Sequence, residues 1–178
     1  MPLLTIVIAS RNDTYMGDSN WRLQTTINFM AENVAELGKG NELEIIVVDW
    51  GSDIPLEREI VLKDYSRKIT RFITVPIALI EEKLGSNIFA DNIAINTAIR
   101  RSKGMFVGYC GNDVLWTTDL FRTLFTLLET TENTDSKSRG NLIVIPRKHI
   151  PSEIVNQNLS IEKLKDFILN YDDFLPVE

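Results

Sequence analysis

The sequence predicts an α/β domain in which helices flank a mostly parallel sheet, and three observations favour this class. Short apolar runs alternate with stretches in which apolar residues recur every three or four positions, so strands and helices alternate along the chain. The first run, residues 3–9, is continuous and β-branched, as in strands buried on both faces of a parallel sheet. Polar clusters follow three of the runs, where ligands bind in such sheets.

The predicted elements follow from local signals, beginning with the strand at residues 3–9. A helix over about residues 20–37 is then indicated by apolar residues at helical spacing: Trp21, Leu23, Ile27, Met30, Val34 and Leu37. Gly38 ends this helix as a C-terminal glycine does. The second strand is residues 43–49, and Pro55 opens a short helix over residues 56–65.

The third strand is predicted at residues 69–76, with weak support from alternating apolar residues. Residues 77–87 are expected to form an irregular connection. A helix pattern then covers residues 89–101, and a strand follows at residues 105–109.

Thr118 and Asp119 fit the N-cap of the next helix, whose inner face carries Leu120, Phe121, Leu124, Leu127 and Leu128. The polar stretch around residues 130–141 is the best candidate for a surface loop. Residues 142–146 are apolar and predict a fifth strand, and residues 161–171 a short terminal helix.

Charge and composition exclude several classes of function. The net charge of −6, from 25 acids and 19 bases, argues against a nucleic-acid backbone as partner. No apolar run approaches the roughly 18 residues of a membrane span, so a cytoplasmic protein without a transmembrane segment is expected. The single Cys110 and single His149 exclude a disulfide framework, a multi-cysteine zinc site and a histidine-cluster metal site. Any metal must therefore have oxygen ligands, which means magnesium, manganese or calcium.

The sharpest polar cluster, residues 49–53, follows the second strand. The carboxylate of Asp49, at the end of a buried strand, can accept hydrogen bonds from a ribose hydroxyl or a base N–H. Gly51 and Ser52 then allow a tight turn beside a ligand. The alternative is that Asp49 and Asp53 only cap the next turn and helix, and the residues alone leave both open.

The other two clusters follow the first and fourth strands. Asp113 can supply a carboxylate to a divalent metal that bridges a diphosphate, and Asn112 a carbonyl ligand. An ordinary Gly-Asn-Asp turn is the alternative, and it is favoured without further context. Arg11 can hold a phosphate and the backbone of Ser10 can meet a base, with a solvated loop as the equal alternative.

Structural explanations are preferred for several other polar residues. Arg100 and Arg101 complement the dipole at a helix C-terminus, His149 is a surface histidine, and Cys110 is a small buried filler. Two tryptophans lie beside the proposed crevice and can stack on a base or sugar: Trp50 and Trp116.

Taken together, these segments resemble the nucleotide-sugar half of the family 2 glycosyltransferases. Residues 5–12 resemble the opening strand and loop of that family. Residues 44–53 are similar to its second strand, which usually ends with an acid, a variable residue and Gly-Ser. Residues 96–104 resemble its helix written Asn-x-Gly-Ile, x-x, Ala-x-Gly, and residues 105–113 fall where its Asp-x-Asp metal motif is expected. The resemblance covers about residues 3–125.

The resemblance implies a GT-A fold, Rossmann-like, and metal-dependent transfer of a sugar from a nucleotide-diphosphate donor, most often a UDP-sugar. It implies that Asp49 recognises the base, usually uracil, and that Asp113 binds Mn²⁺ or Mg²⁺ on the donor diphosphate. The implied nucleotide-sugar-binding residues are Ser10, Arg11, Asn12, Asp49, Gly51, Ser52, Asn96 and Asn112. Residues 1–178 would form one domain, with a donor-binding part at 1–115 and a partial or truncated acceptor part at 116–178.

The sequence also departs from the family pattern. Gly111 replaces the first acid of Asp-x-Asp, Ala98 replaces a glycine, and residues 89–91 (Phe-Ala-Asp) replace an arginine that some members carry. Family members continue into an acceptor half whose acid is the general base. Candidates for that base are placed only by position, and a charged tail is favoured for them: Asp172, Asp173 and Glu178.

Two other functions remain open. The first is a nucleotide-sugar-binding module without turnover, which the glycine at position 111 and the missing acceptor half favour. The second is a Rossmann-type methyltransferase in which Asp49 would hold a cofactor ribose. Residues 10–13 contain no glycine, which disfavours the methyltransferase.

Overall fold

The computed structural model describes residues 1–15, 17–132, 142–151, 154, 157 and 159–170. The chain divides into two compact units, Met1–Glu129 and Thr130–Glu178. None of the described helices is long and apolar enough to cross a membrane.

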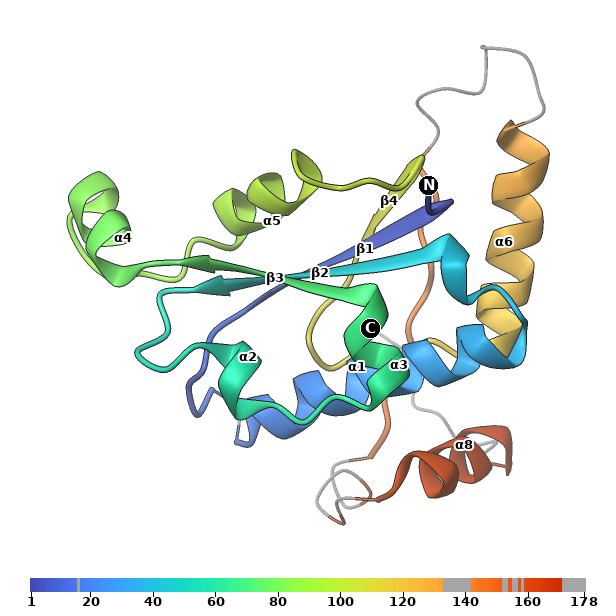
Figure 1. Ribbon diagram of the computed structural model, residues 1–178. Helices are drawn as coiled ribbons and strands as arrows, with labels where there is room; N and C mark the ends of the chain where they lie inside the picture. The colour runs from blue at the N-terminus through green and yellow to red at the C-terminus, as the bar shows by residue number, and fades with distance from the viewer. Residues whose placement is uncertain (16, 133–141, 152–153, 155–156, 158, 171–178) are drawn as a thin grey trace. The chain divides into compact units, whose positions relative to one another are not determined.

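The first unit contains a four-stranded, all-parallel sheet with helices on its faces (Figure 1). The strands are β1 (Leu4–Ser10), β2 (Leu43–Trp50), β3 (Thr70–Val75) and β4 (Phe106–Tyr109). The helices are α1 (Ser19–Glu36), the 3-10 turn η1 (Gly40–Glu42), α2 (Leu56–Glu59), α3 (Asp64–Ile69), α4 (Ile77–Leu84), α5 (Asp91–Ile99) and α6 (Thr118–Glu132). In the second unit, α8 spans Ile161–Asn170. The α/β class predicted from the sequence is confirmed.

The strand order β3-β2-β1-β4 creates a switch in direction beside β1. The chain moves outward from β1 to β2 and β3, then returns and adds β4 on the other side of β1. In open α/β sheets, ligands bind outside the carboxyl ends of the strands at such a switch point. A ligand site is therefore expected at the loops that follow β1 and β4.

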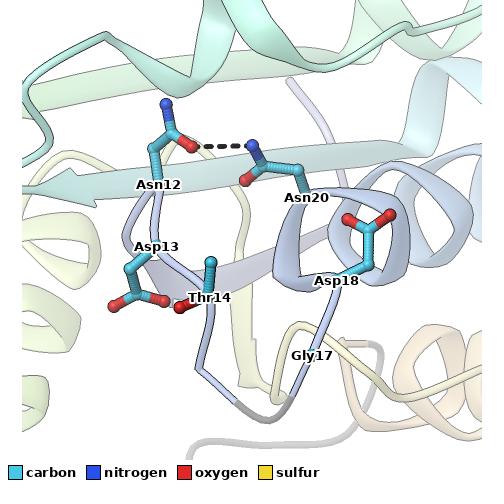
Figure 2. Close-up of a pocket in the computed structure, with 6 residues that line it drawn as sticks. All are labelled: Asn12, Asp13, Thr14, Gly17, Asp18 and Asn20. Carbon is cyan, nitrogen blue, oxygen red and sulfur yellow. Dashed lines mark hydrogen bonds between the residues drawn. The ribbon is translucent and has the colours of Figure 1, made fainter.

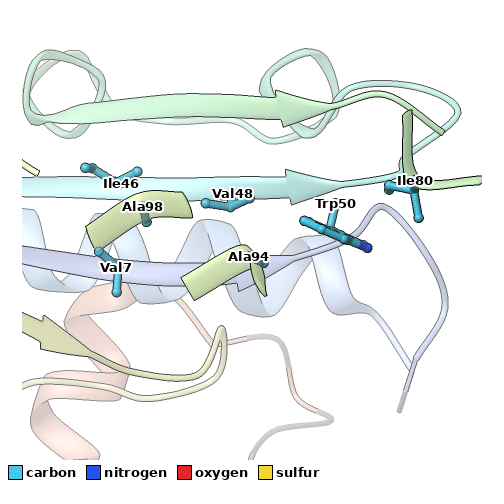
Figure 3. Packing of buried hydrophobic residues seen from close by; sticks show 7 residues of the cluster. All are labelled: Val7, Ile46, Val48, Trp50, Ile80, Ala94 and Ala98. Carbon is cyan, nitrogen blue, oxygen red and sulfur yellow. The ribbon is translucent and has the colours of Figure 1, made fainter. Parts of the chain in front are cut away.

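The sheet is buried on both faces, which is why β1 and β2 are so continuously apolar. On one face, a cluster joins strand residues to α4 and α5 (Figure 3): Val7, Ile46, Val48, Trp50, Ile80, Ala94 and Ala98. The two alanines let α5 approach the strands closely. The opposite face has α1, whose apolar stripe at helical spacing is buried: Leu23, Ile27, Met30 and Val34.

Two predictions about secondary structure were wrong. Residues 142–148 form no strand, and Leu142 and Val144 are 86% and 77% exposed. An apolar run signals a tendency to be buried, but a strand also needs a partner for its backbone, which the run does not specify. Residues 77–84, expected to be irregular, form α4 between Pro76 and Gly85. This helix is too short for apolar periodicity to distinguish it from a loop.

The predicted helix over residues 56–65 is interrupted between α2 and α3. Side chains of α1 bind the backbone there: Gln24 Oε1 accepts from Val61 N (2.8 Å) and Asn28 Oδ1 accepts from Lys63 N (3.0 Å). Ile60 is buried within this break. Tertiary hydrogen bonds thus replace the helical ones. The surface loop predicted at residues 130–141 lies mostly outside the described residues, and α6 continues to Glu132.

A buried carboxylate fastens the amino edge of the sheet. Glu44 Oε2 accepts from Thr5 Oγ1, its register partner on β1, and from Lys103 N, both at 2.8 Å, while Oε1 accepts from Arg71 Nη2 (3.0 Å). Burial alone would raise the pKa of Glu44. The hydrogen bonds from Lys103, Thr5 and Arg71 outweigh it and hold the pKa below its ordinary value.

We expect Glu44→Gln to destabilise the protein at neutral pH by about 1.5–3 kcal/mol, the range for hydrogen bonds to a charged group. A lowered folded-state pKa contributes stability above the unfolded pKa, about 4.3, and this contribution is lost as the pH falls through the folded value. Urea unfolding of both proteins should therefore show a difference at pH 7 that shrinks on acidification. Glu57→Gln, at an exposed position, is the control. A difference that does not depend on pH would contradict the prediction.

Candidate functional site

The three predicted polar clusters meet at the carboxyl edge of the sheet. The parallel register of β1 and β2 pairs Ser10 with Asp49, so residues 10–12 lie beside residues 49–52. On the other side of β1, Cys110 N donates to Val7 O (3.2 Å), which brings residues 111–113 to the same edge. The structure thus assembles what the sequence could only place on separate strands.

The carboxylate of Asp49 organises the loop after β2. Asp49 is 0% exposed; its Oδ1 accepts from Ser52 Oγ, and its Oδ2 accepts from Leu56 N (2.9 Å) at the start of α2. Ser52 Oγ in turn accepts from Asn12 N (2.8 Å). Of the two roles that the sequence left open, the structure shows the capping role. The closed loop does not present the Asp49 carboxylate to a ligand.

Burial raises the pKa of Asp49, although hydrogen bonds from Ser52 and Leu56 and the charge of Arg11 act in the opposite direction. Glu44, five residues earlier on the same strand, shifts downward instead. Burial is the largest influence on both acids and raises the pKa of each. In Glu44 it is outweighed by the hydrogen bonds from Lys103 N, Thr5 and Arg71. In Asp49 the hydrogen bonds from Ser52 and Leu56 N do not outweigh it. Ionisation of Asp49 therefore costs stability.

Arg11 holds the segment before α5 against the ends of β1 and β2. Its Nε donates to Trp50 O (2.8 Å), and Nη1 and Nη2 donate to Asn87 O (3.3 Å) and Asn87 Oδ1 (3.2 Å). Its guanidinium carbon also lies 5.5 Å from the centre of the Phe89 ring. Three of its five N–H groups are thus engaged by the protein, so Arg11 is a clamp in this structure rather than an open phosphate ligand.

The same segment explains Gly51. This glycine has φ 69° and its carbonyl accepts from Asn87 Nδ2 (3.4 Å). A Cβ placed on it would lie 2.4 Å from Asn87 Oδ1 and 2.8 Å from Ile80 Cδ1. Gly51 is therefore required both by its backbone conformation and by close packing against the 85–90 segment.

The expectation that two tryptophans stack on a ligand is not met, because both rings are buried. Trp50 is 4% exposed and its Nε1 donates to Ile88 O (2.8 Å). Trp116 is 5% exposed and its ring centre lies 5.5 Å from that of Phe121. Both rings serve packing, and Trp50 also anchors the 85–90 segment.

Asn112 lies at the switch point between β1 and β4. Its Nδ2 donates to Ser10 Oγ (3.2 Å) and to Ser19 Oγ (3.1 Å) at the start of α1, and its carbonyl accepts from Thr26 Oγ1 (3.1 Å). Further along α1, Asn33 Nδ2 donates to Trp116 O (2.8 Å). The loop after β4 is therefore fixed to α1 by side-chain hydrogen bonds.

Sequence reasoning missed this polar stripe on α1. Ser19, Thr26 and Asn33 are buried and are separated by seven residues, which places them on one side of the helix. The spacing is present in the sequence, next to the more prominent apolar stripe of the same helix. Buried polar side chains at heptad spacing are a usable signal, because each must have a hydrogen-bond partner outside its own helix.

Asp113 and Cys110 occupy contrasting environments in the same loop. Asp113 is exposed, whereas Cys110 is buried, as the sequence predicted. Burial, with a smaller contribution from the charge of Asp113, raises the pKa of the Cys110 thiol to about 12. The thiol is therefore protonated at neutral pH and is not an activated nucleophile.

The protein alone provides little for a metal ion. Within the part of the chain that the structure describes, no three side chains of the types His, Cys, Asp or Glu gather to hold one. At the carboxyl edge, Asp113 presents one exposed carboxylate, and the amide nitrogen of Asn112 is engaged by Ser10 and Ser19. This donor set fits only an ion that receives most of its ligands from a bound molecule.

The remaining predicted residues fall into three groups. Asn96, an expected ligand, is exposed on α5, and within the described residues no hydrogen bond joins its side chain to the loops at the carboxyl edge. Two of the residues with structural explanations behave as predicted: Arg101 Nη1 donates to Thr97 O (3.0 Å) in the last turn of α5, and His149 is exposed. The candidate bases Asp172, Asp173 and Glu178 lie outside the described residues.

A surface hollow of about 530 Å³ adjoins this edge between the end of β1 and the start of α1 (Figure 2). It is lined by Asn12, Asp13, Thr14, Gly17, Asp18 and Asn20. Asn20 Nδ2 donates to Asn12 Oδ1 (2.7 Å), and Asp18 Oδ1 accepts from Trp21 N (2.8 Å) as the N-cap of α1. The lining is rich in oxygen acceptors, which suits a ligand that donates through hydroxyl groups.

Comparison with known proteins does not identify a family for this chain. A scan against protein-family models finds no match for the chain, and a search of curated proteins finds none either.

Gly51→Ala should destabilise the protein more than the same change at another glycine with positive φ. Gly85 has φ 77° with no atom within 4 Å of the built Cβ, so Gly85→Ala measures the backbone cost alone. The clash with Asn87 should add about 1–3 kcal/mol at Gly51. Chemical denaturation of both variants tests this. The additional loss should shrink when both variants are remade in an Asn87→Ala background, and equal losses at the two glycines would contradict the packing argument.

The raised pKa of Asp49 predicts a pH dependence opposite to that of Glu44. A raised folded-state pKa means that the contribution of Asp49 to stability is fully present below the unfolded pKa, about 3.9, and is lost as the pH rises through the folded value. Asn at this position cannot ionise. The stability of the wild type relative to Asp49→Asn should therefore fall as the pH rises through this window and then stay level, as measured by urea unfolding. A relative stability that increases with pH would mean that the buried carboxylate is favoured in its charged form.

Proposed function

We propose that the first unit binds a nucleotide-diphosphate sugar, with a UDP-sugar as the expected donor, and is the donor-binding part of a glycosyltransferase of the GT-A type. The observation that supports this most is the meeting of the loops after β1, β2 and β4 at one edge of a sheet with the order β3-β2-β1-β4. Nucleotides bind at this position in doubly wound sheets. The ordered resemblance of residues 3–125 to family 2 glycosyltransferases points to the same ligand.

In this proposal one set of residues positions the site and another contacts the donor. Asp49 and Ser52 fix the backbone of Asn12 through a chain of two hydrogen bonds. Arg11 and Gly51 hold the 85–90 segment in place. These four residues act through others, and the donor would lie over Asn12 and the hollow beside it.

A divalent ion would enter this site with the donor. Asp113 would contribute one carboxylate, and the diphosphate and water would complete the shell, as the oxygen-rich coordination of Mn²⁺ or Mg²⁺ requires. When bound, the ion would neutralise charge on the departing diphosphate. Asn112, held by Ser10 and Ser19, would fix the backbone from which Asp113 projects.

A nucleotide-sugar-binding module without turnover is the second candidate. It is favoured by Gly111, which stands where the family has the first acid of its metal motif, and by the lack of a three-residue metal group among the described residues. Both candidates use the same ligand site, so binding experiments test them together and a turnover assay separates them.

Calorimetric titration with UDP at increasing Mn²⁺ concentrations tests the shared site. Mn²⁺ should tighten UDP binding, within the 5- to 150-fold range of typical coupling, and UDP should tighten Mn²⁺ binding by the same factor. Asp113→Asn should abolish this coupling while leaving metal-free UDP binding nearly unchanged. Asp53→Asn, which removes the same charge from an exposed position near this edge, should retain the coupling. UDP affinity that is independent of Mn²⁺ in the wild type would leave Asp113 as a turn residue.

Turnover separates the two candidate functions. Incubation with a panel of UDP-sugars and Mn²⁺, with release of UDP as the readout, should show slow donor hydrolysis if the chain is an enzyme. Binding without hydrolysis or transfer would support the module. Absence of binding to every nucleotide diphosphate would remove both.

A further inference from the structure

We infer that the amino edge of the sheet, around the connection from α5 to β4, is a docking surface for an anionic lipid bilayer. This edge lies at the opposite end of the strands from the candidate ligand site, and the inference does not depend on the proposed function. We call it the amino-edge patch and define it by six exposed residues: Ile99, Arg100, Arg101, Lys103, Met105 and Val107.

The patch concentrates positive charge in an acidic protein. Three of the four residues from 100 to 103 are basic and exposed, although the whole chain carries a net charge of −6. Arg71 at the start of β3 donates from Nη2 to the carbonyl of Arg101, but its charge is paired with Glu44 and it is not part of the patch. The buried acid beside them, Glu44, already pairs with Arg71 at 3.0 Å and accepts from the backbone of Lys103. The positive charge of the exposed cluster is thus not cancelled by its nearest buried acid.

Apolar side chains lie beside these cations. Ile99, Met105 and Val107 are 42%, 45% and 41% exposed. Alternation along β4 places Val107 and Tyr109 on one face, and the pairing of Tyr109 with Val7 identifies it as the face covered by α5. Val107 stays exposed on this face, whereas the hydroxyl of Tyr109 donates to Asp91 Oδ2 at the start of α5 (3.2 Å).

The combination of cationic and aliphatic groups favours a bilayer over other anionic partners. Lys and Arg are attracted to anionic head groups, while exposed aliphatic side chains enter the boundary between head groups and acyl chains. A single-stranded nucleic acid would be expected to use aromatic stacking. The exposed aromatic residue on this face of β4, Tyr109, donates to the carboxylate of Asp91, whose negative charge disfavours a nucleic-acid backbone. Docking through this edge would leave the carboxyl edge of the strands turned toward solution.

Co-sedimentation with vesicles tests the inference. The full chain should bind vesicles of phosphatidylcholine with phosphatidylglycerol, bind vesicles of phosphatidylcholine alone far more weakly, and be released by high salt. The combined variant Arg100→Gln, Arg101→Gln and Lys103→Gln should weaken binding to the anionic vesicles about a hundredfold, which corresponds to roughly 1 kcal/mol for each of three basic side chains. Ile99→Ser with Met105→Ser should also weaken it.

A matched control removes the same charge elsewhere. Arg58→Gln, Lys83→Gln and Arg122→Gln alter exposed bases of α2, α4 and α6 and should leave vesicle binding nearly unchanged. Circular dichroism confirms that all variants fold. The inference would be overturned by equal losses of vesicle binding in the two triple variants. It would also be overturned if the protein bound neutral and anionic vesicles equally well. Retention of a single-stranded oligonucleotide by a protein that does not bind the vesicles would overturn it as well.

Discussion

The parallel register between β1 and β2 is the constraint on which the rest of the first unit depends. It pairs Thr5 with Glu44 at one end and Ser10 with Asp49 at the other. The Thr5–Glu44 pair belongs to the hydrogen-bond network of Glu44 at the amino edge. The Ser10–Asp49 pair brings the loops after β1 and β2 together at the carboxyl edge. Because side chains alternate along a strand, a shift of β2 by one residue would exchange its two faces relative to β1 and break both arrangements.

The two buried acids of β2 show how the same residue class serves opposite purposes. Glu44 is held in its charged form by Arg71 and by hydrogen-bond donors, and it stabilises the fold. Asp49 has neutral direct partners and is penalised by burial, yet it closes the loop beside the candidate site. A buried carboxyl group whose pKa is raised by burial, at the edge of a candidate site, is a pattern that binding and active sites often show. The side chains of Arg11 and Asn112 also hold loop backbone in place at the carboxyl edge. Arg11 binds Trp50 O, and Asn112 binds Ser10 Oγ.

The loops at the carboxyl edge are held from two sides by different elements. Arg11 and Trp50 bind the 85–90 segment from the sheet, and the buried polar stripe of α1 binds the loop after β4. The exposed groups that remain, including Asp113, project from a backbone that is already ordered. Such preorganisation lowers the conformational cost of binding a ligand, since little of the backbone must be fixed at that moment.

The sequence by itself determined the α/β class, the four strands of the sheet and the ends of α1, because these depend on local periodicity and local helix signals. It also placed three polar clusters at strand ends. Tertiary structure decided which groups in those clusters remain accessible: it buried Asp49 and Trp50 and left Asp113 exposed. It also interrupted the helix predicted after Pro55, where side chains of α1 bind the backbone, and left residues 142–148 without a strand. The physical reason is the same in each case, since burial and hydrogen-bond partners come from residues distant in sequence, and no local pattern specifies them.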